Sequence, residues 1–222
     1  MSKVVLLLSG GQDSATCLWV AKRSFDDVYP VSFFYGQSHG NELRAAKRVV
    51  DLAREDDNGG AVHRTLELEV SALRSIGGSA LTENGDTSAV REDGLPATFV
   101  PARNAVFLSL AAAYASKVGA ETLMTGVCQT DYSGYPDCRE AFILAQEQAL
   151  SLALGKRMRI LAPLMHLTKA DTVRLMLDFG PLAWRALGET VTCYRGVSCG
   201  TCPACVLRAK GFAEAGYDDP SR

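Results

Sequence analysis

The sequence predicts an α/β fold: a Rossmann-like, doubly wound parallel sheet followed by a short C-terminal metal-binding segment. Three observations predict it. Apolar runs alternate with segments of helical periodicity, the first run stops at a glycine pair that opens a helix, and four cysteines crowd near the C-terminus. Continuous apolar strands separated by helices are typical of parallel sheets covered on both faces. We expect residues 1–180 to form the sheet domain and residues 181–222 to form the cysteine segment packed on it.

The composition excludes several classes of protein. The chain of 222 residues carries 23 basic and 25 acidic residues, so it lacks the basic excess of a broad nucleic-acid binder. No apolar run approaches the length needed to cross a bilayer, and the N-terminus enters the first strand without a secretory pattern. Cysteines at metal-ligand spacing fit a reducing compartment. We therefore expect a cytoplasmic protein with small-molecule substrates and neither membrane nor direct nucleic-acid partners.

The first predicted strand and the loop after it carry the clearest chemical signal. Residues 4–8 are all apolar, residues 9–14 are Ser-Gly-Gly-Gln-Asp-Ser, and residues 13–20 have a helical pattern. Glycines let the backbone turn sharply, so the amides of Gly10 and Gly11 can approach an anion at the helix N-terminus. The loop is neither a Walker A sequence nor a dinucleotide fingerprint. It predicts a phosphate site, and the alternative is an ordinary strand-to-helix turn with an Asp or Ser N-cap.

The next elements continue the alternation of strands and helices. Residues 28–34 predict a second strand, residues 41–54 an amphipathic helix and residues 62–68 a third strand. Gln37 follows the second strand at its carboxyl end, the edge of an open α/β sheet where ligands bind. Residues 71–97 have weak periodicity and many Gly, Ser, Thr and acidic residues. We expect this segment to be a long, mobile excursion that closes over the site as a lid.

An arginine stands at the start of the next predicted helix. Residues 105–118 form an Ala- and Leu-rich helix, which Pro101 and Asn104 can open as helix-entry residues. Arg103 does not suit capping, which needs an acceptor. Its planar and permanently charged guanidinium suits a phosphate or carboxylate, so we expect it to face an anionic ligand.

A second polar loop follows a further strand at residues 121–126. Residues 127–139 offer acceptors, amides, aromatic rings and an arginine, a mixture that suits a flat polar heterocycle such as a purine. The Ser-Gly-Tyr-Pro part of the loop alone is better explained as a Gly/Pro turn. Residues 141–154 then predict a helix and residues 158–161 a short strand.

The following helix is expected to begin after Thr168, a suitable N-cap residue. Lys169 would lie in its first turn, where the helix dipole disfavours a cation, so we expect a bound anion nearby. His166 is either a catalytic base or, as a lone histidine more often is, structural.

Four of the seven cysteines follow a C-x5-C-x2-C-x2-C pattern: Cys193, Cys199, Cys202 and Cys205. This spacing predicts a closed, tetrahedral zinc site of the structural type, which pins a segment with little apolar content. An iron–sulfur cluster and a redox cysteine pair are the alternatives. Cys128 and Cys138 flank the second polar loop, where they could face the pocket.

Together these motifs resemble one enzyme family. The loop at residues 9–14 resembles the Ser-Gly-Gly-x-Asp-Ser signature of the N-type ATP pyrophosphatases, whose fold is adenine nucleotide alpha hydrolase-like. Nearly the whole chain resembles the 7-cyano-7-deazaguanine synthases, through that loop, residues 35–37, 99–104, 126–128, 133–139 and 163–165, and the cysteine cluster.

The resemblance implies a C–N bond-forming ligase that makes 7-cyano-7-deazaguanine for queuosine biosynthesis. Its substrates would be 7-carboxy-7-deazaguanine and ammonia, and it would require ATP, Mg²⁺ and structural Zn²⁺. The resemblance also implies the order of steps: ATP first adenylates the carboxylate, ammonia displaces AMP to give an amide, and a second ATP drives dehydration of that amide. We also expect a homodimer.

The resemblance assigns roles residue by residue. It implies that ATP contacts Leu8, Ser9, Gly10, Gly11, Gln12, Asp13, Ser14 and Gly126. It implies that the deazaguanine substrate contacts Gln37, Arg103, Asn104, Tyr135, Asp137 and Arg139. Asp13 would approach magnesium, while Arg103 and Lys169 would stabilise the charge that develops as pyrophosphate leaves, so these three residues are the expected catalytic set. The four clustered cysteines match the zinc ligands.

Two features depart from the family pattern. The spacer between Cys193 and Cys199 is shorter than usual, and Gln129 stands where an acidic residue is usual. Loss of that carboxylate motivates an alternative function, in which the same adenylation stops at the amide or joins the deazaguanine to a protein or other acceptor in DNA modification or phage defence. A non-catalytic nucleotide-binding module is a third class, disfavoured by the intact loop and Arg103. Release of AMP separates the third class from the others, and product mass separates the first two.

Overall fold

The computed structural model of the chain describes residues 1–36, 40–83, 85–129 and 134–221. Across these residues the strands form one six-stranded sheet in the order β3-β2-β1-β5-β6. The sixth strand, β4, also pairs with β2, further along that strand than β3 does. The strands are β1 (Lys3–Leu7), β2 (Asp27–Phe34), β3 (Ala61–Val62), β4 (Leu66–Glu69), β5 (Thr122–Met124) and β6 (Arg159–Leu161). Every pairing between described strands is parallel. The doubly wound parallel sheet predicted from the sequence is therefore confirmed.

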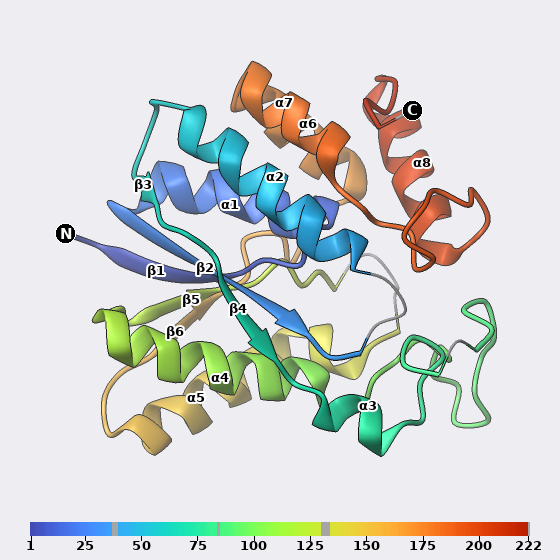
Figure 1. Ribbon diagram of the computed structural model, residues 1–222, viewed down its shortest axis with the longest axis horizontal. Coiled ribbons are helices and arrows are strands. Elements are labelled where there is room, and N and C mark those ends of the chain that lie inside the picture. The colour runs from blue at the N-terminus through green and yellow to red at the C-terminus, as the bar shows by residue number, and fades with distance from the viewer. Residues whose placement is uncertain (37–39, 84, 130–133, 222) are drawn as a thin grey trace.

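Helices cover both faces of this sheet (Figure 1). One layer contains α1 (Gln12–Ser24), α2 (Asn41–Glu55), α6 (Lys169–Asp178), α7 (Pro181–Glu189) and α8 (Pro203–Ala215). The opposite layer contains α4 (Arg103–Val118) and α5 (Glu140–Leu154). A short helix, α3 (Ala72–Ile76), follows β4, and a single 3₁₀ turn, η1 (Pro136–Cys138), precedes α5.

The central strand β1 shows why the apolar run is continuous. Val4 and Leu6 pack in the cluster beneath α1 and α2, whereas Val5 packs in the cluster beneath α4. All three side chains are fully buried, because successive side chains of a strand point to opposite faces and both faces are covered. Leu187 of α7 and Phe212 of α8 belong to the first cluster, so the C-terminal helices share the core of the sheet.

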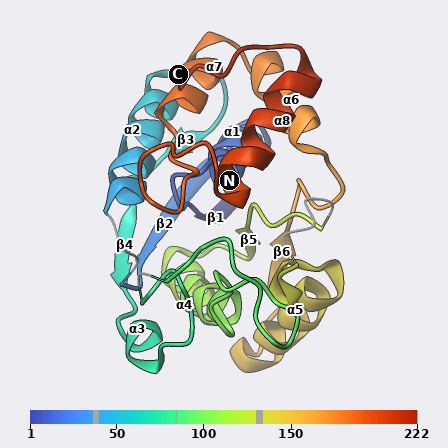
Figure 2. The same ribbon diagram turned by 90° about the vertical axis from the view of Figure 1, so that its right-hand side faces the viewer.

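The carboxyl ends of the strands meet at one edge, where the order of strands reverses between β1 and β5. Figure 2 looks toward this edge and shows the cysteine-containing loop and α8 on one side and the segment after α3 on the other. Open α/β sheets bind ligands at such a switch point. The fold therefore gathers segments far apart in the sequence around one edge.

Several element boundaries differ from the sequence prediction. The single third strand expected at residues 62–68 is split into β3 and β4, both paired with β2. Helix α4 begins at Arg103, before the expected residue 105, and neither Pro101 nor Asn104 caps it with a side chain. Instead Ala102 adopts a left-handed conformation with φ 59°, and the carboxylate of Asp137 accepts the backbone N–H of Asn104 at 3.2 Å.

Two further segments bear on the sequence predictions. Thr168 is the N-cap of α6 and forms a reciprocal capping box with Asp171, as its position predicts. Residues 71–97 contain α3 and a series of turns, with Leu73 and Leu81 buried. In the described part of the chain, no helix combines the length and apolar character needed to cross a bilayer.

Candidate functional site

A cavity of about 320 Å³ lies at the sheet edge, and the ends of both β1 and β5 contribute to its wall. Segments from across the chain meet around it, which is the arrangement expected at a switch point. The residues that sequence reasoning assigned to the site and that line the cavity are Leu8, Ser9, Gly11, Gln12, Asp13, Ser14, Arg103, Asn104, Gly126, Tyr135 and Lys169.

Ser14 organises the predicted phosphate loop from inside. Its hydroxyl oxygen accepts the backbone N–H groups of Ser9 and Gly10, each at 3.2 Å, and its hydroxyl donates to the carbonyl of Gly11 at 3.0 Å. The N–H of Gly11 lies 3.3 Å from the hydroxyl oxygen of Ser9. These bonds hold the loop amides on the hydroxyls of Ser14 and Ser9 at the start of α1, where the helix dipole attracts anions.

Two glycines let this loop pack closely against its neighbours. Gly10 has φ 90°, and a Cβ built on it would lie 2.2 Å from the carbonyl oxygen of Glu42 in α2. A Cβ on Gly126, just after β5, would lie 3.0 to 3.1 Å from backbone atoms of Asp13 and Ser14. Gly126 lines the cavity, whereas Gly10 fixes the loop on α2. Any larger side chain at either position would displace the loop.

Asp13 and Lys169 form a close ion pair across the cavity wall. The Nζ atom of Lys169 lies 2.7 and 2.5 Å from the two carboxylate oxygens of Asp13. Their side chains are 30% and 14% exposed, respectively, so water screens the pair only in part. The position of Lys169 in the first turn of a helix predicts an anion nearby. In the structure this anion is the carboxylate of Asp13.

Arg103 projects from the first residue of α4 into a group of tyrosines. Its Nη1 lies 3.4 Å from the phenol oxygen of Tyr35, and its guanidinium carbon lies 5.7 Å from the centroid of that ring. The phenol oxygens of Tyr135 and Tyr194 lie 3.5 Å apart. Burial raises the pKa of both Tyr35 and Tyr194, so these phenols stay neutral. A permanent cation surrounded by neutral phenols suits an anionic ligand.

The remaining substrate-binding candidates are placed differently. Neither Asp137 nor Arg139 is among the described residues that line the cavity. Asp137 is buried and joins η1 to α4: its carboxylate accepts the Asn104 backbone N–H, and its carbonyl accepts the Asn104 side-chain amide at 3.1 Å. Arg139 is exposed. Gln37 lies outside the described residues, and the substrate contacts of all these residues stay predictions.

Gln129 and His166 lie outside the described cavity wall. The side-chain carbonyl of Gln129 accepts the backbone N–H of Glu140, the first residue of α5, at 3.1 Å. Gln129 therefore caps a helix, a task that the usual carboxylate would also perform. The side chain of His166 is 65% exposed, with its Nε2 3.5 Å from the carboxylate of Glu140. This position favours the structural interpretation of His166 over the catalytic one.

Cys128 and Cys138 both line the cavity. The thiol of Cys128 donates to the carbonyl of Leu167 at 3.3 Å, and the side-chain amide of Asn104 lies 3.5 Å from the sulfur of Cys138. Burial, reinforced by the nearby Asp137 charge, raises the pKa of Cys138 to about 12. Cys138 is therefore a neutral thiol at physiological pH and a poor nucleophile.

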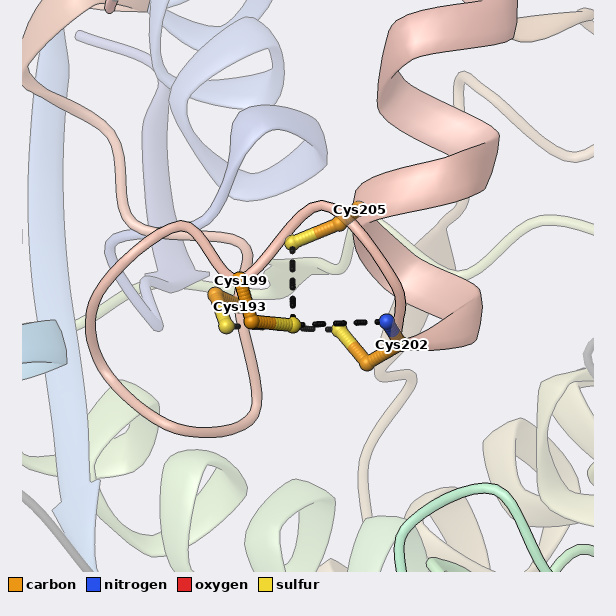
Figure 3. A group of neighbouring side chains, drawn as sticks. All are labelled: Cys193, Cys199, Cys202 and Cys205. Atoms are coloured by element: carbon orange, nitrogen blue, oxygen red, sulfur yellow. Dashed lines mark hydrogen bonds between the residues drawn. The ribbon is translucent and has the colours of Figure 1, made fainter.

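The four clustered cysteines converge on one point (Figure 3). Their sulfur atoms all lie within 4.8 Å of one another, and the Cys193–Cys202 and Cys199–Cys205 sulfur pairs are each 4.0 Å apart. Tetrahedral zinc with Zn–S bonds of about 2.3 Å separates its sulfurs by about 3.8 Å, so the cluster fits zinc. Hydrogen bonds from Thr201 and from the Cys202 backbone lower the pKa of Cys199 to about 5. The shortened spacer still closes the cluster.

The cysteine segment forms part of the cavity wall. Thr192 and Tyr194, which flank Cys193, both line the cavity. A Cβ on Gly211 of α8 would lie 2.5 Å from the Cβ of Lys169, so α8 packs directly on the turn that carries the lysine. A metal bound by the cluster would thus stabilise the wall and the position of Lys169 together.

Sequence reasoning missed Glu42 and Tyr194 as cavity residues. Glu42 lies in the first turn of α2, and burial raises the pKa of its carboxyl to about 7 although the charge of Arg103 opposes the shift. The helix expected after the second strand begins at the carboxyl edge of the sheet, where ligands bind. The position of Glu42 in the first turn of that helix could therefore have predicted that it lies at the site. Tyr194 could have been predicted as a site residue from its position next to Cys193.

Comparisons with known proteins agree on one family. The family model described as "Queuosine biosynthesis protein QueC" matches residues 3–216. A 7-cyano-7-deazaguanine synthase of Laribacter hongkongensis is 49% identical over 221 residues, covering 97% of this chain and 92% of that protein. A synthase of the same name from Chromobacterium violaceum is 49% identical over 225 residues, covering 98% of this chain and 92% of that protein.

Among solved structures, a 4-thiouridine synthetase crystallised with RNA and bound ATP has the same fold. The TM-score is 0.55 at 18% sequence identity, and the match covers 96% of this chain. It covers 53% of the synthetase, so this chain spans about half the length of that protein.

Proposed function

Since the chain belongs to the QueC family of queuosine biosynthesis proteins, we propose that it converts 7-carboxy-7-deazaguanine and ammonia to 7-cyano-7-deazaguanine with ATP. The carboxylate is adenylated, ammonia replaces AMP to give the amide, and a second ATP removes the amide oxygen. The chain is then a ligase that forms a C–N bond. Close relatives bearing the name 7-cyano-7-deazaguanine synthase support this reaction.

One feature of this chain's own structure supports the proposal. The Ser-Gly-Gly-Gln-Asp-Ser loop, Arg103 and Lys169 share a single cavity at the switch point of the sheet. Adenylation requires groups that hold a triphosphate and cations that face the leaving pyrophosphate. The loop supplies the first and the two basic side chains supply the second.

The roles of the charged residues follow from their contacts. Lys169 holds the carboxylate of Asp13 in place at the loop, where that carboxylate would bind Mg²⁺. Bound Mg²⁺ would neutralise charge on the phosphate oxygens. Arg103 would bind the substrate carboxylate or the pyrophosphate, and Tyr35 orients its guanidinium. Asn104 and Tyr135 would contact the deazaguanine ring on the same wall.

The alternative function, amide release or transfer to another acceptor, rested on the missing carboxylate at Gln129. Because Gln129 caps α5 and lies outside the described cavity wall, its amide does not remove a charge from the site. Nitrile synthesis is therefore the favoured outcome.

Further properties follow from the same proposal. We propose that ATP and Mg²⁺ bind at the loop and that Zn²⁺ binds Cys193, Cys199, Cys202 and Cys205. Residues 181–222 would then be a zinc-binding segment packed on the ATP pyrophosphatase domain of residues 1–180. The protein would act in the cytoplasm as a homodimer.

The first test of the site is Asp13→Asn. Loss of the carboxylate should lower AMP formation that depends on 7-carboxy-7-deazaguanine by about a hundredfold or more, since it removes the anion that would bind Mg²⁺. Zinc content should not change. The matched control is Asp178→Asn, which changes an exposed carboxylate at the end of α6 opposite Lys169 and should keep full activity. Turnover retained by Asp13→Asn would remove Asp13 from the mechanism, and wild-type protein without substrate-dependent AMP formation would refute the proposed function.

A further inference from the structure

The cavity contains an acidic residue for which the adenylation chemistry has no role. We propose that Glu42 is the general base of the ammonia step: its carboxylate takes the proton that nitrogen loses as the amide forms. This inference rests on the proposed function and adds to it the residue that accepts protons.

The position of Glu42 brings it beside the phosphate loop. It lies in the first turn of α2 and lines the cavity together with Ser9 and Arg103. Its backbone is held against the loop, because only a glycine fits at position 10, where a Cβ would lie 2.2 Å from the Glu42 carbonyl oxygen. An acyl adenylate held by this loop would place its reacting carbon in the same cavity.

The other acidic groups near the cavity are already engaged. Among the described residues that line it, the carboxylates are those of Asp13 and Glu42. Both oxygens of Asp13 are held by Lys169, and the buried carboxylate of Asp137 binds the start of α4. No hydrogen bond or ion pair within the described part of the chain holds the Glu42 carboxylate.

The surroundings of Glu42 suit a base that works near neutral pH. Burial raises the pKa of its carboxyl to about 7, while the guanidinium of Arg103 opposes that shift. The phenol of Tyr35 faces it from the end of β2 and is itself kept neutral by burial. A general base is most effective when its pKa lies near the working pH. Cys138, a further proton-bearing group of the wall, has a pKa of about 12 and stays a thiol.

A simpler role for an acidic residue in a first turn is stabilisation of the helix dipole. That role requires an ionised carboxylate, and the interaction with the dipole would lower its pKa. The pKa of Glu42 is raised instead. Desolvation of this half-buried carboxyl therefore outweighs any stabilisation of its charge by the helix dipole, which favours a role other than capping.

The chemical step balances with one proton acceptor. The lone pair of ammonia forms the new C–N bond to the acyl carbon, and the bond between that carbon and the AMP oxygen breaks. AMP leaves with the electron pair of that bond. Nitrogen enters with three hydrogens and remains in the amide with two, and the third passes as a proton to the carboxylate of Glu42, which returns it to water.

The test separates acyl activation from ammonia transfer in Glu42→Gln. Activation is measured as ATP–pyrophosphate exchange that depends on 7-carboxy-7-deazaguanine, without ammonia. Transfer is measured as amide formation with ammonium and as hydroxamate formation with hydroxylamine, whose addition intermediate loses its proton to water more readily. Glu55→Gln, at the exposed end of the same helix, is the matched control.

We expect Glu42→Gln to keep exchange within about threefold of wild type and to lose about a hundredfold or more in amide formation. Hydroxamate formation should fall much less. The ratio of wild-type to variant amide formation should shrink as the pH falls through about 7, where Glu42 becomes protonated. Glu42→Asp, which keeps an ionisable group, should restore part of the amide rate and its pH dependence.

Two results would overturn the role of Glu42 while leaving the proposed function intact: equal losses in exchange and amide formation, or amide formation close to wild type. Absence of substrate-dependent exchange in the wild-type protein would instead refute the proposed function itself. If Glu42→Gln does not fold, the same comparison is made on Glu42→Asp, which must lose more amide formation than exchange.

Discussion

Gly10 is the residue on which the shape of the phosphate loop depends most. Its φ of 90° is unfavourable for any residue with a Cβ, and that Cβ would lie 2.2 Å from a carbonyl oxygen and 2.8 Å from an amide nitrogen of α2. Neither contact can be relieved by a side-chain rotation. The loop and α2 therefore hold each other in place through backbone atoms.

We predict that Gly10→Ala destabilises the protein by about 3 kcal/mol, since left-handed backbone costs about 1–2 kcal/mol and overpacking costs about 1–3 kcal/mol. Urea denaturation measures this loss. Gly11→Ala is the matched control for stability, because a Cβ there would meet only ordinary contacts at 3.4 and 3.7 Å. Equal stability of the two variants would contradict the close packing of the loop on α2.

Glu42 makes a second prediction that does not depend on activity. Its ordinary pKa of 4.5 applies to the unfolded chain, and its pKa of about 7 applies to the folded protein. Between these values the unfolded chain has released the proton that the folded protein keeps, so this carboxyl lowers stability as the pH rises through 7. Glu42→Gln should therefore gain stability relative to wild type between about pH 4 and pH 8, by up to about 3 kcal/mol.

Denaturant titrations of the two proteins at a series of pH values measure that difference. A stability difference that does not change with pH would show that Glu42 titrates in the folded protein as it does in the unfolded chain. It would also remove the electrostatic support for its role as a base.

At the residue scale, the sequence identified the loop but not the contacts of its side chains. The apolar run and the two glycines predict the loop because both requirements are local. The pairing of Asp13 with Lys169 joins residues 156 positions apart, and the charge that opposes the raised pKa of Glu42 belongs to Arg103 in the opposite helix layer. Sequence reasoning therefore gave Asp13 and Lys169 their types of chemistry but missed that they pair, and it missed Glu42 altogether.

At the scale of elements, the C-terminal segment connects the metal cluster to the cavity. Helix α8 begins next to Cys202 and packs on α6 at Gly211, beside Lys169. Arg208 of α8 forms an ion pair with Asp219 at 2.6 Å, and both side chains are less than 9% exposed. The segment is thus fixed at the start of α8 by the cluster and in the middle of the helix by this ion pair.

We predict that Cys202→Ser removes zinc and lowers the melting temperature. A loss of about 3 kcal/mol, typical of losing a structural site in a folded domain, corresponds to about 6–12 °C for a chain of this size. Substrate-dependent exchange should fall as well, because Thr192 and Tyr194 form the cavity wall next to the cluster. Metal analysis and thermal denaturation make the test. Full thermal stability in a zinc-free variant would contradict a structural role for the metal.

Most helices and strands were predicted from the sequence, but a strand break and two helices were not. Strands and helices of the sheet were predicted because their apolar periodicity is strong. The break between β3 and β4 was missed, since a short gap within an edge strand leaves little trace in the pattern. Helices α7 and α8 were not predicted; their buried faces pack on the helices and core of the preceding domain, a tertiary contact that local pattern does not reveal.

The lid role of residues 71–97 stays a prediction, and Leu81 of that segment lines the cavity.

At the scale of the whole molecule, the parallel sheet explains why one cavity collects residues from so many segments. The carboxyl ends of parallel strands share an edge, so each loop that follows a strand contributes to the same site. The sequence could therefore predict which loops meet there. It could not predict that the cysteine segment closes the cavity, because that depends on how α8 packs across α6.

Under the proposed function, this cavity turns a carboxylate into a nitrile through two activations by ATP. Mass spectrometry of the products formed from 7-carboxy-7-deazaguanine, labelled ammonium, Mg²⁺ and ATP tests it most directly, with AMP quantified in the same reaction. We predict a nitrile that carries the labelled nitrogen, with about two AMP per nitrile, one for each activation. Amide as the final product, or AMP released only when a protein acceptor is added, would contradict it.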